Sequence, residues 1–308
     1  MRADRVPPVA ESMDIKSYLT EKRAVVEEAL AGYMLAAEGP LSRHIEAMRY
    51  SLFAGGKRVR PILALAAAEA LGAETTPLLP VACGLECIHT YSLIHDDLPA
   101  MDDDDLRRGK PTNHVVFGEA EAILAGDGLL SFAFELMTHP DIRRAASGED
   151  LVRIIHLVAR AIGPTGMVGG QSLDLAAEGR EIPYEQLRLI HRCKTGALIT
   201  ASVQAGAVFA GTDQERFAAL SKYGESIGLA FQIVDDLLDV EGSTEDLGKT
   251  AGADVERKKA TYPAFFGVER TRSMARDAVA AALAALADFD ERAEPLRALA
   301  RYIYDRKK

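Results

Sequence analysis

The sequence predicts an all-α fold made of a single domain. Ala and Leu recur at helical spacing from Asp14 to the C-terminus, and no segment alternates apolar and polar residues as a half-buried strand does. Hydrophobic residues make up 48% of the 308 residues, which is enough for a large core. No linker rich in Pro, Gly or Ser divides the chain, so residues 1–308 are interpreted as one domain whose residues 1–12 form a disordered leader.

The helical periodicity divides the chain into segments with ordinary start and stop signals. Glycines end or interrupt several segments, and prolines stand where a first helical turn tolerates them. No internal repeat of about 20 to 50 residues is present. Helices are expected over residues 14–37, 41–54, 59–72, 77–97, 119–138, 149–162, 183–210, 213–240, 270–289 and 294–306.

Composition excludes several classes of protein. The formal net charge of −10, which no basic face offsets, argues against a nucleic-acid-binding protein. Cys83, Cys87 and Cys193 are too few for a disulfide framework and indicate a reducing compartment, so a cytoplasmic protein is expected. No apolar stretch is expected to reach the ~20 residues that span a bilayer. The N-terminus also lacks a signal-peptide layout, so stable membrane insertion is not expected.

Two aspartate clusters stand beside otherwise apolar helical runs. Their members are Asp96, Asp97 and Asp102–Asp105 in the first cluster, and Asp235, Asp236 and Asp239 in the second. Carboxylates on apolar helix faces repel one another and lose hydration unless a cation lies between them. Mg²⁺ is the simplest such cation, because it binds hard oxygen ligands and lets phosphate oxygens complete its shell. The two clusters therefore suggest a diphosphate held between them, with a solvated acidic loop as the alternative for the first.

The spacing within each cluster is consistent with metal binding. Asp235 and Asp239 are four residues apart and project from one helix face. Asp96 and Asp102 are six apart and would diverge by about 120° on an unbroken helix. Pro99 lies between them and cannot continue the helix without a break. A turn just before this proline would bring Asp102 back toward Asp96.

Basic residues accompany both clusters. Arg107 and Arg108 follow the first cluster directly, where a metal-bridged phosphate site needs guanidinium groups. The segment Gly55–Pro61 joins two glycines to three cations at the start of a helix, which suits anion binding, with an ordinary basic loop as the alternative. Lys194 lies within an apolar segment and needs either a charge partner or a route to solvent. Lys249 and the pair Lys258 and Lys259 follow the second cluster.

Several of these motifs, in order, resemble those of the trans-isoprenyl diphosphate synthases. The two aspartate-rich motifs carry the resemblance most clearly, as Ile94–Asp102 followed by Arg107–Thr112, and later as Gln232–Asp239. The other motifs in family order are Gly56–Pro61, Gly169–Gln171, Lys194–Gly196 and Gly248–Thr250. The similarity covers essentially the whole chain and is greatest to the prokaryotic-type farnesyl diphosphate synthases.

The resemblance implies a bundle of ten or more helices around a central prenyl-binding cavity. In the family reaction an allylic diphosphate loses pyrophosphate, isopentenyl diphosphate attacks the allylic cation, and a proton is then removed. The resemblance therefore implies condensation of isopentenyl diphosphate with dimethylallyl and geranyl diphosphates to (E,E)-farnesyl diphosphate. It implies Mg²⁺ as the cofactor, about three ions per active site, with Mn²⁺ as a substitute. A homodimer is expected.

The same resemblance implies a role for each candidate residue. The implied metal ligands are Asp96, Asp102 and Asp235, with Asp97, Asp236 and Asp239 as further candidates. The residues implied to act in catalysis are Lys194, Thr195, Gln232 and Arg107. The residues implied to bind the two substrates are Gly56, Lys57, Arg60, His89, Arg107, Arg108, Lys194, Thr195, Gln232, Lys249 and Lys259. Gln171 and Asp174 are expected to support them from a neighbouring helix.

Product length is expected to depend on Tyr91, the fifth residue before Asp96. Five residues of helix place its side chain about 7.5 Å below the first aspartate, where a bulky ring could form the floor of the prenyl cavity. The choice of Tyr91 rests on the resemblance, in which an aromatic residue here goes with a fifteen-carbon product, and an ordinary core tyrosine is the alternative. The rival functions are a geranylgeranyl diphosphate synthase, a class I terpene cyclase and a non-catalytic synthase subunit.

Overall fold

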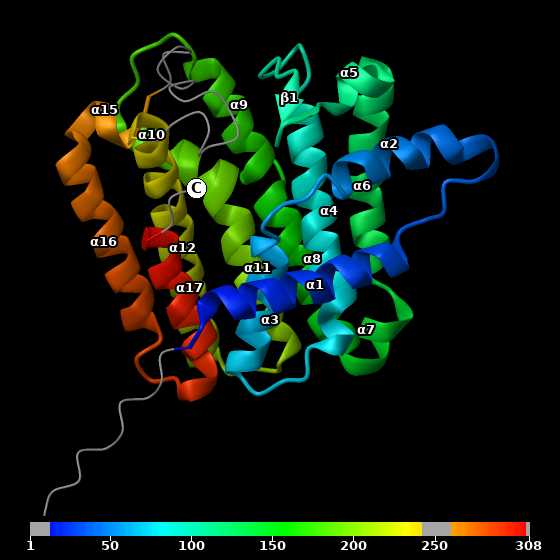
Figure 1. Cartoon of the computed structure of the whole chain (residues 1–308). Helices are drawn as coiled ribbons and strands as arrows, with labels where there is room; N and C mark the ends of the chain where they lie inside the picture. The colour runs from blue at the N-terminus through cyan, green and yellow to red at the C-terminus, as the bar shows by residue number, and fades with distance from the viewer. Residues whose placement is uncertain (1–12, 242–259, 306–308) are drawn as a thin grey trace, which may run out of the picture.

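A computed structural model describes residues 13–241 and 260–305, and its long elements are all helices (Figure 1). The all-α prediction is confirmed. In chain order the longer helices are α1 (Ile15–Tyr33), α2 (Ser42–Leu52), α3 (Val59–Ala70), α4 (Leu79–Asp96), α6 (Glu119–Met137), α8 (Gly148–Ile162), α9 (Met167–Ala177), α10 (Tyr184–His191), α11 (Ala197–Phe209), α12 (Gln214–Glu241), α16 (Val268–Ala285) and α17 (Glu294–Asp305). The shorter elements are α5 (Asn113–Phe117), α7 (Pro140–Ala145), α15 (Tyr262–Phe266), a π turn (Arg192–Gly196), and the strands β1 (Leu106–Arg107) and β2 (Lys110–Pro111).

The expected helix over residues 183–210 is one continuous helical run with an irregularity in the middle. Helix α10, the π turn Arg192–Gly196 and α11 follow one another without a break. Single π turns inside α-helices are rare and frequently occur at functional sites. The short helices α5, α7 and α15 were not expected, because five or six residues carry too little periodicity to be recognised in the sequence.

Two large apolar clusters hold the bundle together. One joins α4, α6 and α8 through fully buried residues such as Leu85, Leu129 and Ile154. The other joins α3, α11, α12, α16 and α17 through residues such as Ile62, Val203 and Ile227. Helix α3 is apolar except at Arg60 and Glu69 and is buried along nearly its whole length, as expected of a helix in the interior of a bundle.

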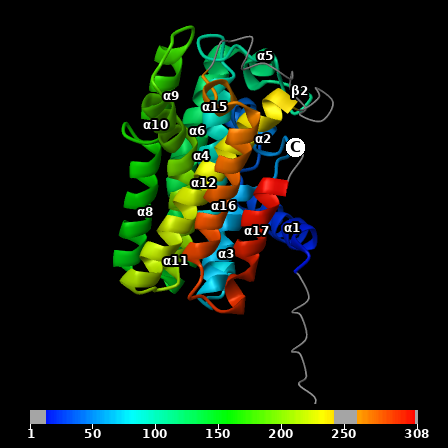
Figure 2. The ribbon, with the colours of Figure 1, turned by 90° about the vertical axis from the view of Figure 1, so that its left-hand side faces the viewer.

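The arrangement of the helices brings the functional motifs to one end of the bundle. Most long helices run side by side, while α1 crosses in front of them (Figure 1). The C-terminal end of α4 lies at the same end as α5, α9, α10, α15 and the two short strands, at the top of Figures 1 and 2. The end of α12 lies there as well (Figure 2). Both aspartate motifs therefore lie at one end of the bundle, although about 140 residues separate them in the chain.

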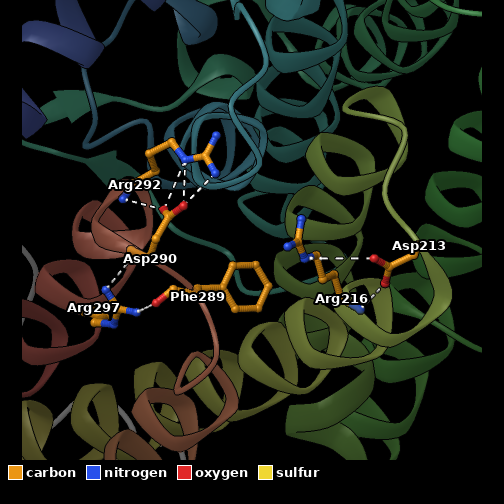
Figure 3. Close-up of polar contacts among 6 residues, drawn as sticks. All are labelled: Asp213, Arg216, Phe289, Asp290, Arg292 and Arg297. Atoms are coloured by element: carbon orange, nitrogen blue, oxygen red, sulfur yellow. Dashed lines mark hydrogen bonds and ion pairs between the residues drawn. The ribbon is translucent and has the colours of Figure 1, made fainter.

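The opposite end of the bundle is closed by the corner between α16 and α17. Asp290 accepts hydrogen bonds from the backbone N–H and the guanidinium of Arg292, and Arg297 donates to the carbonyl oxygen of Phe289 (Figure 3). Arg297 also donates to the carbonyl oxygen of Leu286. Asp213 caps the start of α12 by accepting from the Arg216 N–H at 2.8 Å. The polar groups of this corner are therefore hydrogen-bonded within the chain.

Two helical segments among the described residues are long and apolar enough to cross a membrane by length and composition alone, so the expectation that no stretch reaches this length was wrong. Thr76–Asp96 is 72% buried, as a core helix is. Gly148–Ala177 has a mean hydropathy of 1.3 and is 28% buried, and the bend at Gly163–Gly166 divides it into α8 and α9.

Candidate active site

A cavity of about 720 Å³ lies where the motifs meet, between α4, α9, the π turn and α12. It brings together residues from parts of the chain that are far apart in sequence. The predicted site residues that line it are Arg60, His89, Tyr91, Asp96, Arg107, Arg108, Gln171, Lys194, Thr195 and Asp235. Its apolar walls include Leu93, Met101, Met167, Leu175 and Phe231. The cavity thus joins acidic and basic groups at one side to an apolar interior.

The first aspartate motif turns back on itself as the proline predicted. Helix α4 ends at Asp96, and the N–H of Asp102 donates to the Asp96 carbonyl oxygen at 2.8 Å. Asp103 has a φ of 52°, in the left-handed region, where the chain reverses. The pKa of Asp96 is raised to about 6, mainly by burial and also by the nearby Asp102, while Lys194 opposes the rise. A carboxylate in this state gains from any added cation.

Asp97 serves a different purpose from Asp96. It is 3% exposed, and its two oxygens accept hydrogen bonds of 2.8 and 2.9 Å from Nε of Arg107. Burial raises the pKa of Asp97, and the hydrogen bond from Arg107 opposes that rise. Asp97 therefore positions Arg107, whose guanidinium lines the cavity, and Asp97 itself lies outside the cavity lining.

A hairpin that the sequence analysis missed holds both arginines. Strands β1 and β2 pair Leu106 with Pro111 and Arg107 with Lys110. The two residues between them, Arg108 and Gly109, have φ values of 55° and 74°. Positive φ at both central residues is the hairpin turn that matches the twist of the strands. The glycine was the available signal, but two-residue strands are too short to show alternation.

Of the acidic residues in the second motif, Asp235 lines the cavity, while Asp236 and Asp239 are each 3% exposed and lie outside the lining. Asp236 accepts hydrogen bonds of 2.9 Å from the Tyr262 N–H and from Nε2 of Gln232. It therefore fastens α15 to α12. The three carboxylates were grouped as candidate metal ligands, but in the structure Asp235 lines the cavity whereas Asp236 is hydrogen-bonded between two helices.

The π turn places Lys194 and Thr195 in the cavity wall. Nζ of Lys194 donates to Asp174 at 2.7 Å, so the expected supporting role of Asp174 takes the form of an ion pair. Burial lowers the pKa of Lys194, but Asp174, Asp96 and Asp102 raise it by more, so the ammonium stays charged. A Cβ on Gly170 would lie 2.3 Å from the Lys194 backbone nitrogen. The glycine is needed for α9 to pack directly on the π turn.

Thr195 and Gln232 hydrogen-bond to one another. Oγ1 of Thr195 donates to Oε1 of Gln232 at 3.2 Å, and Gln232 donates in turn to Asp236. Thr195 lines the cavity, and Gln232 lies behind it. Of these two residues implied to act in catalysis, Thr195 is therefore the one that borders the cavity.

The basic side of the cavity is built on a loop that Arg58 stabilises. Arg58 has a φ of 54°, is 3% exposed, and donates to Glu86 at 2.7 Å and to the Leu52 carbonyl oxygen at 2.8 Å. Its charge is thus used within the fold, whereas its neighbour Arg60 lines the cavity. Nε of Arg60 is buried and has no hydrogen-bond partner among the described residues.

His89 and Arg108 complete this basic side. Burial, with Arg60 and Arg108 nearby, holds the pKa of His89 well below its ordinary value, so the imidazole is neutral at pH 7. Arg108 donates to the Gly55 carbonyl oxygen, and a Cβ on Gly56 would lie 2.8 Å from its guanidinium. Gly56 therefore serves the site by letting Arg108 approach the loop.

Lys57 does not line this cavity. Lys57 lines a separate pocket of about 250 Å³ with residues of α1 and α17, among them Arg23 and Tyr302. Its predicted contact with a substrate stays a prediction. Lys249 and Lys259 lie outside the described residues.

The acidic residues fit a divalent metal that is completed by a ligand. Within residues 13–241 and 260–305, no three His, Cys, Asp or Glu side chains lie close enough to hold an ion by themselves. Mg²⁺ is commonly bound by one or two carboxylates with waters and phosphate oxygens in its other positions. The raised pKa of Asp96 and the buried amide of Gln171, which has no hydrogen-bond partner in the described part of the chain, leave polar groups for such a complex.

Comparison with known proteins agrees with this geometry. The polyprenyl synthetase family profile matches residues 42–300. The chain belongs to the polyprenyl synthetase family. A farnesyl diphosphate synthase of Geobacillus stearothermophilus is 51% identical over 256 residues, which are 83% of this chain and 86% of that protein. A chloroplastic geranylgeranyl pyrophosphate synthase of Catharanthus roseus is 49% identical over 95% of this chain and 81% of its own.

A solved structure extends the family assignment to the whole fold. The apo crystal structure of a farnesyl/geranylfarnesyl diphosphate (FPP/GFPP) synthase from Zymomonas mobilis superposes with a TM-score of 0.84 and 38% identity, covering 94% of this chain and 99% of that one. The bundle is therefore the isoprenoid synthase fold. The chain is a trans-prenyltransferase, and prenyl diphosphates fit as its substrates. Members of this polyprenyl synthetase family use a divalent metal to bind diphosphate.

Proposed function

We propose that this trans-prenyltransferase condenses isopentenyl diphosphate with dimethylallyl diphosphate, and then with geranyl diphosphate, to give (E,E)-farnesyl diphosphate. The single observation that carries the product length is Tyr91. Its ring is 6% exposed and borders the cavity, and it packs edge-on against His95 with the ring centroids 5.5 Å apart. A ring fixed in this way limits the depth available to a growing prenyl chain.

Two groups of side chains would receive the two diphosphates. Asp96, Asp102 and Asp235 would hold Mg²⁺, which supplies positive charge where the leaving diphosphate becomes negative. Arg107 and Lys194 are held at the same mouth by Asp97 and Asp174 and would bind the allylic diphosphate.

The basic side would bind isopentenyl diphosphate without metal, since Arg60, His89 and Arg108 line the cavity together and both arginines lie near the neutral imidazole. The apolar walls at Met167, Leu175 and Phe231 would keep water from the allylic cation, which water would otherwise convert to an alcohol. Thr195 would offer its hydroxyl oxygen to the same cation.

Geranylgeranyl diphosphate synthesis is the second candidate, because the Catharanthus roseus relative carries that name at nearly the same identity. The two candidates are separated by incubating the protein with Mg²⁺, isopentenyl diphosphate and dimethylallyl diphosphate and identifying the products by mass. The proposal expects fifteen carbons as the main product. A main product of twenty carbons would replace it with the second candidate.

A substitution at Tyr91 tests the reason given for the product length. Tyr91→Ala removes the ring and should shift the products to twenty carbons or more, with turnover largely retained, because the ring limits depth and holds no diphosphate. Ser92→Ala, in the same wall, is the matched control and should leave the product unchanged. Chromatography of the dephosphorylated products measures both. An unaltered farnesyl product from Tyr91→Ala would place the floor elsewhere.

We also propose that the protein is a cytoplasmic homodimer. Dimerisation is supported by apolar side chains left exposed on α6 and α8, among them Leu124 at 53% and Val152 at 68%. Exposed apolar residues mark an interaction surface where they form a contiguous patch, and Ile123 and Leu124 are adjacent in the chain and both exposed. Sedimentation equilibrium should give twice the chain mass, and Leu124→Glu should lower it; a monomer at micromolar concentration contradicts the proposal.

The free thiols of Cys83, Cys87 and Cys193 support a reducing compartment.

A further inference from the structure

A second large cavity lies on the other side of the π turn. It has a volume of about 790 Å³, is open to solvent, and is lined by residues of α8, α10, the π turn, α11 and α12. The two cavities divide the π turn between them. Lys194 and Thr195 line the active-site cavity, whereas Arg192, Cys193 and Gly196 line the second one. Neither the family reaction nor the proposed product assigns a role to this second cavity.

The charge of the second cavity is opposite to that of the chain. Four cationic side chains line it, and Glu225 is its one acidic residue; the cations are Arg160, Arg188, Arg192 and Lys222. The whole chain has 36 Lys and Arg residues against 46 Asp and Glu residues. A cavity with three more cations than acids in such a chain is a local site for anions.

Little within the described chain neutralises these cations. Arg188 and Lys222 have weak exposed ion pairs, at 3.8 Å to Glu185 and 3.6 Å to Glu225. For Arg160 and Arg192, the described residues include no hydrogen-bond or ion-pair partner. Exposed ion pairs at such distances contribute little to stability, so an incoming anion loses little free energy by displacing Glu185 or Glu225 from its cation.

Neutral donors also border the cavity. Nδ1 of His191 is buried and has no hydrogen-bond partner among the described residues. Burial lowers the pKa of His191 to about 4, so its imidazole is neutral at pH 7. The hydroxyls of Thr165, Thr200 and Ser226 lie in the same lining. Cations from several helices together with neutral donors suit a compact anion with many acceptor oxygens, and a diphosphate has this chemistry.

We propose that this cavity is a second, metal-independent binding site for a diphosphate group. The four cations reach it from α8, α10, the π turn and α12, so a diphosphate at its centre is held by four separate elements. Free pyrophosphate and the head group of a prenyl diphosphate share this chemistry. Leu157 and Leu229 in the lining provide an apolar wall for a prenyl tail.

Cys193 gives this proposal a readout that the active-site cavity does not share. It is the partly exposed member of the three cysteines, whereas Cys83 and Cys87 are fully buried. Cys193 lies in the lining of the second cavity, and its thiol donates to the carbonyl oxygen of Thr165, another lining residue, at 3.6 Å. A diphosphate bound there covers the thiol and slows its alkylation by iodoacetamide, a neutral reagent.

The experiment measures alkylation of Cys193 by mass spectrometry in EDTA at rising concentrations of inorganic pyrophosphate. The wild-type rate is expected to fall about ten-fold at saturation. Arg160→Gln/Lys222→Gln removes two cations of the cavity that are distant in sequence from Cys193, and should raise the half-protecting concentration about ten-fold or more. Circular dichroism checks that this variant is folded, and Arg188→Gln/Lys222→Gln provides a second pair with the same expectation.

Two controls separate this site from net charge and from the active site. Arg143→Gln/Arg276→Gln removes two exposed cations outside both cavities. In this variant pyrophosphate should protect Cys193 from alkylation as it does in the wild type. Arg108→Gln alters the active-site cavity and should also protect like wild type. Absence of protection in the wild type, equal protection in the Arg160→Gln/Lys222→Gln variant, or loss of protection in either control overturns the proposal.

A further arm identifies the source of the diphosphate. A non-ionisable prenyl thiodiphosphate that protects Cys193 at lower concentration than pyrophosphate assigns the site to a prenyl diphosphate whose tail uses the Leu157 and Leu229 wall. Equal protection assigns it to free pyrophosphate. Both outcomes support the site, and neither depends on whether the enzyme's product has fifteen or twenty carbons.

Discussion

Aspartate and arginine lie close together at both ends of the bundle, but the pKa values of the carboxylates at the two ends are shifted in opposite directions. At the active-site end, burial raises the pKa of Asp96 to about 6. At the α16–α17 corner, hydrogen bonds from the side chain and backbone of Arg292 lower the pKa of Asp290 to about 2 (Figure 3). The corner supplies its own cation to an exposed carboxylate. At the active site, burial disfavours the charged form of Asp96 by more than the nearby Lys194 and Arg107 offset, so an added metal cation is stabilising there.

The largest expected difference between the two ends is in turnover. Asp96→Ala and Asp235→Ala should each lower kcat by about 10²–10³-fold or more, because each removes a carboxylate from the place where leaving-group charge is stabilised. Asp290→Ala is the matched control at the other end and should keep wild-type kcat. Steady-state kinetics measures all three variants. Near-normal turnover in Asp235→Ala would remove that residue from the metal site.

The next difference is in stability and concerns the two arginines. Arg107→Ala leaves Asp97 buried without its main partner and should lower the free energy of unfolding by about 1–3 kcal/mol. Arg292→Ala removes a pair whose side chains are 51% and 43% exposed, so its effect should be smaller. Urea denaturation in EDTA gives both values. A larger loss in Arg292→Ala than in Arg107→Ala would reverse the comparison.

The smallest expected effects are in the pH dependence of stability, and they have opposite signs. The folded-state pKa of Asp96, about 6, is above the ordinary 3.8, so between these values the folded state binds a proton that the unfolded state has lost. The contribution of Asp96 to the free energy of unfolding therefore falls as pH rises from about 4 to beyond 6. The folded pKa of Asp290, about 2, is below 3.8, so its contribution is full above about pH 4 and is lost as pH falls through 2.

Denaturation of the metal-free protein across pH, compared with Asp96→Asn and Asp290→Asn, measures these slopes. The wild type should lose stability relative to Asp96→Asn as pH rises from 4 to 7. It should lose stability relative to Asp290→Asn as pH falls from 4 to 2. Two slopes of the same sign would mean that the carboxylates do not differ in the way described.

Local signals predicted most of the helices and the turn after α4. The hydrophobic period gave the long helices other than α9, which lies outside every expected range, and Pro99 gave the reversal that returns Asp102 to Asp96. Residue type also predicted that Lys194 needs a partner, and the partner is Asp174. These features depend on neighbours in the chain or on the cost of a buried charge, both of which can be read from sequence.

Other parts of the site depend on contacts between distant residues. Lys57 was grouped with Arg60, but the left-handed conformation of Arg58, fixed by Glu86 on α4, separates them into different cavities. The division of labour between Asp96 and Asp97 follows from the hairpin that carries Arg107 back to α4. Neither contact has a local sequence pattern, which is why both were missed.

Thermal denaturation with Mg²⁺ and a non-hydrolysable diphosphate is the most direct test of the claim that the acidic end binds a metal–diphosphate complex. At ligand concentrations about 100 times Kd, mass action should add about 2.7 kcal/mol to the stability of the wild type. Asp290→Asn should show the same rise in Tm, and Asp96→Asn should lose most of it. An unchanged wild-type midpoint with both ligands present, or an equal rise in Asp96→Asn, would contradict the account.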